Sequence, residues 1–122
     1  MNEFERYTIK NIDFKYPNAY YKLIELGLTD FDIWFFMEEK QATGIFEGMK
    51  NRYPDRNLIP FAKRSDNDDT ACFELETENK VQLIHDFASS GWEQRGEYED
   101  LWSWLKEAID TLVDFSRDEE GI

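Results

Sequence analysis

The sequence contains few of the residues that build covalent crosslinks, metal sites or membrane spans. Cysteine and histidine occur once each, as Cys72 and His85, so no internal disulfide can form and a zinc site would need unusual, carboxylate-rich ligation. No apolar run approaches the length of a membrane span, and the first ten residues, MNEFERYTIK, contain no apolar signal-peptide core. We therefore expect a cytoplasmic protein that does not associate with membranes.

Basic residues are also scarce, because 14 Lys and Arg stand against 27 Asp and Glu, for a net charge of −13. Most of such a surface repels a phosphate backbone or an anionic membrane, so neither is an expected partner, whereas a basic protein is attracted. From Glu93 to the C-terminus there are ten acids and three bases, so the last quarter carries about half of the excess. Acidity of this kind also keeps proteins soluble, so charge alone leaves both explanations open.

Aromatic residues are abundant, with ten Phe, six Tyr and four Trp. Together with 122 residues and 41% hydrophobic side chains, this composition predicts a single folded domain over residues 1–122 with one core. No internal repeat, low-complexity segment or Gly/Ser linker marks a domain boundary.

Hydrophobic periodicity predicts an α+β fold with helices packed on a mostly antiparallel sheet. Residues 1–15 fit a helix and a strand equally well. The later segments are distinct, with helices expected at 17–26, 38–54 and 98–115 and strands at 31–37, 58–62, 70–76 and 80–87. The last three strands form an antiparallel meander, in which the short TENK segment joins the second to the third.

Two features of these elements have structural consequences. Pro60 cannot donate a ladder hydrogen bond, which indicates a bulge or an edge strand, and an exposed edge is a place where a homodimer could form. In the helix at 98–115, the apolar residues occupy one half of the helical surface and the polar residues the other. We expect this long amphipathic helix to lie flat on the sheet with an acidic outer face.

The acidic cluster Asp66, Asp68 and Asp69 is a candidate metal or catalytic site. A helix–loop–helix calcium loop starting at Asp66 needs Gly at its sixth position and a carboxylate at its twelfth, where this chain has Ala71 and Thr77. The surrounding residues are polar and include two bases, which is typical of a solvated loop rather than a dry pocket. The pattern favours a seven-residue hairpin loop whose Asp and Asn side chains bond their own backbone, with a weaker Mg²⁺ or Ca²⁺ site as the alternative.

No other motif indicates an enzyme. Cys72 and His85 lie on strands expected to be neighbours and could form a nucleophile–base pair in one of two registers, but a cysteine in an alternating strand is more often a packed side chain. The chain has no phosphate-binding glycine loop, nucleophile elbow or dinucleotide fingerprint. In the aromatic segment SSGWEQRGEYEDLWSWL, Trp92 and Arg95 precede the last helix and are candidates for exposed binding residues.

The order of these segments resembles the SUKH superfamily, the Smi–Knr type of domain. The resemblance runs from about Tyr16 to Ile109 through YPNAYYKLI, IWFFM, LIPFAKRSDNDDTACFELE, KVQLIHDF and FASSGWEQRGEYEDLWSWLKEAI. Each piece is degenerate, so the resemblance rests on their order, and Asp68–Asp69 stand where many members have a Gly-Asp pair. It implies an α+β domain without catalytic activity. In bacterial immunity proteins, such a domain is thought to bind and neutralise a cognate toxin, often a basic nuclease.

From these observations we predict a non-enzymatic immunity-type protein that binds a basic toxin domain and needs no cofactor or metal. The alternatives are a regulatory or scaffolding interaction module of the Smi–Knr type without a toxin partner and, less favoured, a small metal-dependent enzyme. The predicted partner-binding residues lie in two places, the acidic turn and the later loop: Asp66, Asp68, Asp69, Trp92, Glu93 and Arg95.

Overall fold

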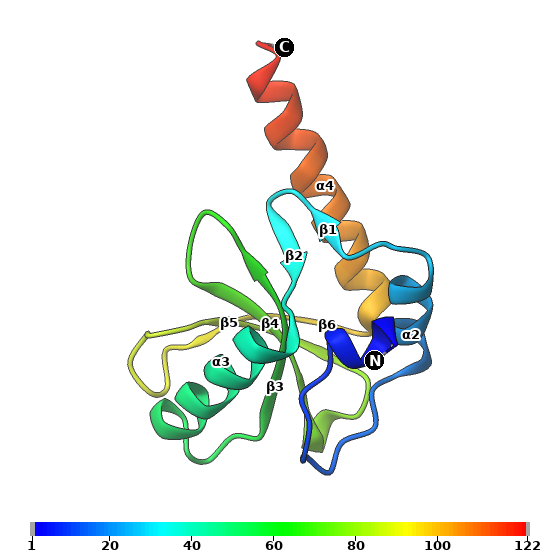
Figure 1. Ribbon diagram of the computed structural model, residues 1–122. Helices are drawn as coiled ribbons and strands as arrows, with labels where there is room; N and C mark the ends of the chain where they lie inside the picture. Colours follow the sequence, from blue (N-terminus) through cyan, green and yellow to red (C-terminus); the bar gives the residue numbers. More distant parts are fainter. Residues whose placement is uncertain (1, 122) are drawn as a thin grey trace.

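The computed structural model describes residues 2–121, which form an α+β domain around one six-stranded sheet (Figure 1). Neighbouring strands are antiparallel and follow chain order across the sheet, from β1 to β6. The strands are β1 (Asp30–Phe31), β2 (Trp34–Phe36), β3 (Leu58–Arg64), β4 (Asp69–Glu74), β5 (Val81–His85) and β6 (Gln94–Tyr98). The helices are α1 (Glu3–Arg6), α2 (Asn18–Glu25), α3 (Glu39–Arg52) and α4 (Leu101–Glu119), with a 3₁₀ turn at Leu75–Thr77. The predicted fold class is confirmed, including the strand meander.

The main core lies on the sheet face covered by α2, the N-terminal segment and the first half of α4. It is largely aromatic, because the alternating residues of β3 and β4 place Phe61 and Phe73 on this face, stacked with ring centroids 4.5 Å apart. Tyr20 of α2 and Trp104 of α4 pack against Phe61 from above. The ambiguous residues 1–15 contribute to this core through Tyr7 and Ile9 as well as forming the short α1.

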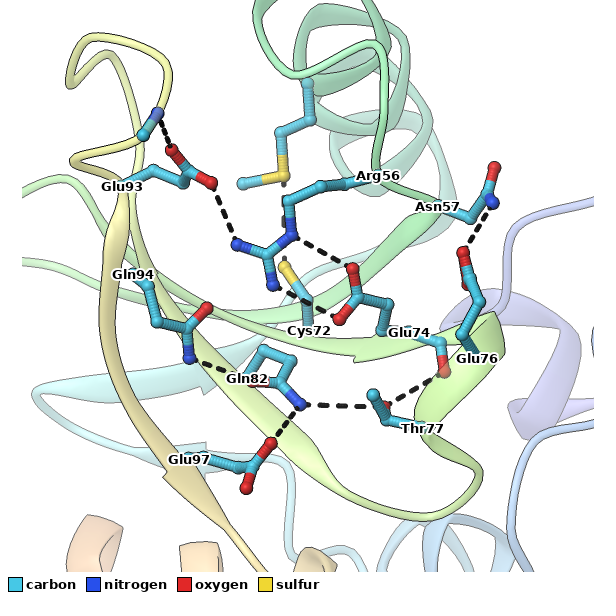
Figure 2. A network of polar contacts seen from close by, with 12 residues as sticks. Arg56, Asn57, Cys72, Glu74, Glu76, Thr77, Gln82, Glu93, Gln94 and Glu97 are labelled. Carbon is cyan, nitrogen blue, oxygen red and sulfur yellow. Dashed lines mark hydrogen bonds and ion pairs between the residues drawn. The ribbon is translucent and has the colours of Figure 1, made fainter.

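The opposite face of the sheet is only partly covered. Helix α3 packs on β3 and encloses a smaller apolar cluster of Met49, Tyr53, Leu58, Cys72 and Ile84. On the same face, β4, β5 and β6 present polar side chains (Figure 2). One face of the sheet is aromatic, and the other is partly apolar and partly polar. Apolar and polar residues therefore alternate only incompletely along the predicted strands.

Several details differ from the sequence prediction. The segment 31–37 is a hairpin rather than one strand, because Asp32 adopts a left-handed φ of 70° and its N–H donates to Asp30 Oδ1 at 2.9 Å. Strand β3 lies inside the sheet, and its register shifts between Pro60 and Ala62, so the bulge is confirmed and the edge is wrong. The turn between β3 and β4 spans four residues, 65–68, and not seven.

The sequence prediction missed β6, whose residues Gln94–Tyr98 are mostly polar. This strand pairs with β5 on one side only and forms the sheet edge, so it needs no apolar alternation. The helix predicted at 98–115 is observed at Leu101–Glu119, capped by the Asp100 carboxylate, which accepts from the Ser103 N–H.

Helix α4 does not lie flat on the sheet along its whole length. Its first half packs on the core, and its second half runs past the β1–β2 hairpin and projects from the domain (Figure 1). The buried residues are Leu101, Trp104, Ala108 and Thr111. Within residues 2–121, no helix combines the length and apolar character needed to cross a membrane.

Candidate partner-binding site

The connection between β5 and β6, residues 86–93, is the strongest candidate for a binding site, and we call it the aromatic loop. It carries Phe87, which is 66% exposed, and Trp92, which is 79% exposed. These are the two most exposed large hydrophobic side chains that the described part of the chain presents. A single exposed aromatic residue is ordinary, but two on one short loop mark a place where burial against a partner would be favourable.

The beginning of the aromatic loop is fixed by a buried ion pair. Arg52, the last residue of α3, donates from Nε and Nη2 to the two carboxylate oxygens of Asp86, both at 2.8 Å. The Asp86 side chain is 2% exposed and also accepts from the Phe87 N–H at 2.9 Å. Bidentate pairs of this kind fix orientation as well as distance, so α3 determines the direction in which the chain leaves β5.

Phe87 itself is held in an unusual backbone conformation. Its φ of 71° lies in the left-handed region, which a bulky side chain rarely adopts. The guanidinium of Arg52 lies 4.2 Å from the centre of the Phe87 ring, a cation–π contact that holds the ring at the surface. Strain at an exposed aromatic residue, supported by the surrounding ion pair, is typical of a functional position.

The end of the aromatic loop is fixed by a second ion pair (Figure 2). The buried Glu93 carboxylate accepts from Arg56 Nη1 at 2.9 Å and from the Gly91 N–H at 2.7 Å. Gly91 has a φ of 96°, which only glycine adopts without strain. Burial by itself raises the pKa of Glu93, but the hydrogen bonds from Arg56 and the backbone outweigh it, so the pKa lies below its usual value. The Glu93 carboxylate is therefore charged and internal at neutral pH.

Arg56 connects this loop to the centre of the sheet. Its Nε and Nη2 donate to the two Glu74 carboxylate oxygens on β4 at 2.9 and 3.1 Å, while its Nη1 reaches Glu93 (Figure 2). Tyr53 adds a hydrogen bond from its hydroxyl to the Ala88 carbonyl at 2.7 Å. Three residues at the end of α3 and just beyond it, Arg52, Tyr53 and Arg56, thus anchor the loop at both ends and in its middle.

Polar side chains continue from the aromatic loop across the open face of the sheet. Gln82 of β5 donates to the Glu97 carboxylate of β6 at 2.9 Å and accepts from Gln94 at 2.8 Å (Figure 2). Lys80 approaches the other Glu97 oxygen at 3.4 Å. The side chains of this row bond one another, and the row begins at Gln94, directly after the aromatic loop.

The predicted site residues fall into different environments. Trp92 is exposed on the aromatic loop, and Arg95 is exposed on β6, with no acid within ion-pair distance among residues 2–121. Glu93 is not available to a partner, because it is buried and bound to Arg56. The sequence prediction gave Glu93 a contact role, whereas in the structure its carboxylate is enclosed and holds the end of the aromatic loop through Arg56 and the Gly91 N–H.

The acidic residues between β3 and β4 lie in a separate place, and we call residues 65–69 the aspartate turn. Asp66 is bound bidentately by Arg64 at 2.8 and 2.9 Å, and this hydrogen bonding lowers the pKa of Asp66. Lys63 lies 3.6 Å from the Asp68 carboxylate, and Asp69 Oδ1 lies 2.9 Å from His85 Nδ1. Each of the three aspartates therefore has a basic or imidazole neighbour of its own.

The alternative chemical sites do not come together in the structure. Cys72 pairs with Gln82 across the β4–β5 ladder, whereas His85 pairs with Asp69, so the thiol and the imidazole are not neighbours. Cys72 is fully buried against the Met49 sulfur at 3.8 Å, and burial raises the pKa of its thiol well above the usual value. Across residues 2–121, no group of three or more His, Cys, Asp or Glu side chains is arranged to hold a metal ion.

The residues that hold the aromatic loop were not identified from the sequence. Phe87, Asp86, Arg52 and Arg56 are separated from one another by up to 35 positions, and no local pattern predicts their contacts. The expected strand at 80–87 included Asp86 and Phe87, whereas β5 ends at His85 and these two residues begin the loop. Comparisons of the chain with protein-family models, curated proteins and solved structures give no match.

Proposed function

We propose that this protein is a non-enzymatic protein-binding domain of the immunity type, which binds and neutralises a basic toxin domain through its aromatic loop. The observation that carries the proposal is the pair of exposed aromatic residues, Phe87 and Trp92, on a loop held by two buried ion pairs. The toxin as partner comes from the SUKH resemblance and remains an expectation of that resemblance.

The rigidity of the aromatic loop supports a binding role. Binding residues that are already ordered lose little conformational freedom on association, so more of the contact energy appears as affinity. Trp and other large aromatic side chains dominate the energetics of protein interfaces when they enter a pocket on the partner. Phe87 and Trp92 fit the role of such anchors, with the polar row of Gln82, Gln94 and Glu97 as the surrounding rim.

The charge of the protein supports a basic partner. A net charge of −13 accelerates encounter with a positive surface and disfavours nucleic acid. The expected mechanism is occlusion, in which this acidic domain covers the surface that the toxin uses for its own anionic substrate. The aspartate turn is not part of the proposed contact surface, because its carboxylates are already paired within the chain, and any contribution it makes is through long-range attraction.

The direct test is a pull-down of the product of the adjacent gene by the purified protein, in low and in moderate salt. We expect retention by the wild-type chain and loss of retention by the double variant Phe87→Ala/Trp92→Ala, since truncating two central anchors removes several kcal/mol, roughly 2 for each. Leu26→Ala is the matched control, because Leu26 is also an exposed hydrophobic residue but lies at the end of α2. Thermal unfolding of all three proteins verifies that the fold is intact.

Two results would contradict the proposal. If the wild-type protein retains no partner in either salt condition, the immunity function is wrong. If the double variant retains the partner as well as the Leu26→Ala control does, the partner binds elsewhere and the aromatic loop is not the site.

A further inference from the structure

Helix α4 carries two parallel, mainly apolar stripes, of which the domain buries most of the first and leaves most of the second partly or fully exposed. The inner stripe consists of Leu101, Trp104, Ala108, Thr111 and Phe115. The outer stripe follows it one residue later at every position and consists of Trp102, Leu105, Ile109, Leu112 and Ser116. A shift of one residue is about 100° around a helix, so the two stripes face different directions.

The inner stripe explains how α4 is attached to the domain. Leu101, Trp104 and Ala108 are buried in the aromatic core. Further along, the Phe115 ring lies 5.8 Å from the Arg64 guanidinium, which also lies 5.8 Å from the Trp34 ring. The projecting half of α4 is therefore tied to the end of β3 by this contact, and its orientation is defined.

The outer stripe is exposed. Trp102 is 45% exposed and Ile109 is 42% exposed, and Val113 beside them is exposed as well. Leu105 and Leu112 are half-buried, and Leu105 also packs against the core of the domain. Beyond the β1–β2 hairpin, Figure 1 shows no other element beside α4.

The spacing of the outer stripe is that of a coiled-coil seam. Its residues follow one another at intervals of three, four, three and four, which is the a/d repeat of a heptad pattern. Such a seam is matched by another helix rather than by a flat surface, because each apolar side chain enters a hole between side chains of the facing helix. The occupant expected for this stripe is therefore helical.

The charges beside the outer stripe indicate which helix fits. Between residues 96 and 121 the chain has only two bases, Lys106 and Arg117, and both lie on the border of the outer stripe that faces away from the domain. Asp110 lies on the same border, between them in sequence. A border that carries both signs can complement a copy of itself, whereas a uniformly basic partner helix would meet Lys106 and Arg117 with like charge.

We propose that two copies of this chain associate through the outer stripes of α4 as an antiparallel, two-fold helix pair with Ile109 at the axis. In this arrangement Lys106 lies opposite Leu112 of the second copy. Asp110 of the second copy precedes that Leu112 by two residues, which is about 3 Å along the helix, so its carboxylate lies within reach of the lysine. Arg117 lies opposite Leu101 of the second copy, next to the acidic residues that precede it. A parallel pair places Lys106 against the inner-stripe side of the other helix, where no acid balances it.

This arrangement is independent of the proposed function. The projecting end of α4 and the aromatic loop lie at well-separated places in the molecule (Figure 1). A dimer formed through α4 leaves both aromatic loops exposed. Loss of dimerisation therefore leaves binding at the loop intact, and loss of the loop leaves the dimer intact.

Analytical ultracentrifugation of the full chain over a range of protein concentrations tests the proposal. We expect a concentration-dependent dimer for the wild type and a monomer for Ile109→Glu, which places two acids together at the axis. Trp92→Ala is the control and is expected to dimerise like the wild type. A wild-type chain that stays monomeric at high micromolar concentration overturns the proposal, as does an Ile109→Glu variant that still dimerises.

Charge exchange tests the pairing of Lys106 with Asp110. Lys106→Glu and Asp110→Lys are each expected to weaken the dimer roughly tenfold, because each places like charges across the pair, and the double variant Lys106→Glu/Asp110→Lys is expected to recover it. Circular dichroism verifies that α4 remains helical in each variant. Equal dissociation constants for the two single variants and the wild type contradict the antiparallel register.

Crosslinking tests the orientation directly. Trp102 lies seven residues before Ile109 and Ser116 seven residues after it, so these two positions meet across an antiparallel pair. A mixture of Trp102→Cys and Ser116→Cys proteins is expected to form an interchain disulfide under mild oxidation, whereas either protein alone is not. The natural Cys72 is fully buried and does not interfere. Crosslinking of Trp102→Cys with itself indicates a parallel pair and overturns the arrangement.

Discussion

The aromatic loop and the aspartate turn are both connections between neighbouring strands of one meander, and both contain arginine–carboxylate pairs. In the aspartate turn the pair is local, since Arg64 and Asp66 are two residues apart. In the aromatic loop the pairs are long-range, since Arg52 and Arg56 of the α3 region reach Asp86 and Glu93, 34 and 37 residues later. The local ion pair joins two residues beside the same turn and does not link the turn to a distant part of the domain. The long-range ion pairs attach the aromatic loop to the α3 region.

Burial separates the two regions as clearly as sequence distance does. The Asp66 side chain is 34% exposed, but Asp86 is almost completely enclosed although its geometry with arginine is nearly the same. An exposed pair adds little stability because water screens it, whereas an enclosed carboxylate depends on its partner. The comparison shows that the clustered acids of the aspartate turn are paired at the surface, whereas the enclosed acids of the aromatic loop hold exposed aromatic residues outward.

The largest expected effect comes from removing the arginine that bridges the sheet and the loop. Arg56→Ala leaves Glu74 and Glu93 without their counter-charge, so we expect the free energy of unfolding to fall by about 3 kcal/mol. The matched variant Arg64→Ala removes the β3 arginine that pairs with Asp66 of the aspartate turn and is expected to lower the free energy of unfolding by about 1 kcal/mol. Urea unfolding measures both.

Amide hydrogen exchange distinguishes the same two variants by their effect on the aromatic loop. In Arg56→Ala the Gly91 amide is expected to exchange faster than in the wild type, because the carboxylate that accepts from it is no longer held. In Arg64→Ala this amide is expected to be unchanged. Similar destabilisation by the two variants would remove the distinction between a loop fixed to the domain and a turn fixed to itself.

The sequence contained most of the fold but little of what holds the site. Helix α2 was predicted at 17–26 because helical periodicity is a local signal, and the helix buries Tyr20, Leu23 and Ile24. Strand β6 was missed because an edge strand on a polar face needs no apolar pattern. Local sequence patterns therefore identify helices and strands that have a buried apolar face. They do not identify an element, such as β6, whose structure depends on pairing with a neighbouring strand.

The extent of burial along α4 was also beyond the sequence. Its nine apolar residues indicate a wide apolar face, and nothing in the sequence says that the domain buries mainly the inner stripe. The same holds for Glu93 and Trp92, which are adjacent in sequence but are respectively buried and exposed. The inward direction of Glu93 goes with its bond to Arg56, which lies just beyond α3 and 37 residues earlier in the sequence.

A smaller effect is expected from the charge of Glu93 alone. Because the folded pKa of Glu93 lies below its ordinary value of 4.5, its charge stabilises the fold above that pH, and the contribution disappears as pH falls through the folded pKa. Glu93→Gln keeps the shape and loses the charge, so we expect it to lower the free energy of unfolding by about 1 kcal/mol near neutral pH. In strong acid the variant and the wild type should converge, since Glu93 is then protonated in both states.

Stability measured across pH for both proteins checks this expectation, and their difference removes the contribution of Asp66, whose pKa is lowered too. A difference that stays constant from neutral to acid pH would mean that Glu93 acts through its shape and not through its charge.

The smallest effect is expected at Asp68, the most exposed carboxylate of the aspartate turn. Its nearest base, Lys63, is 3.6 Å away, so Asp68→Asn should change the free energy of unfolding by less than about 0.5 kcal/mol. If the aspartate turn only attracts a basic partner at long range, the variant slows association slightly, and added salt cancels the difference because it screens exposed charges. Association and dissociation rates of the complex, measured in low and moderate salt, separate this role from direct contact. A faster dissociation that persists in salt would place Asp68 in the interface, and the two connections would then form one binding surface rather than a binding loop and a self-paired turn.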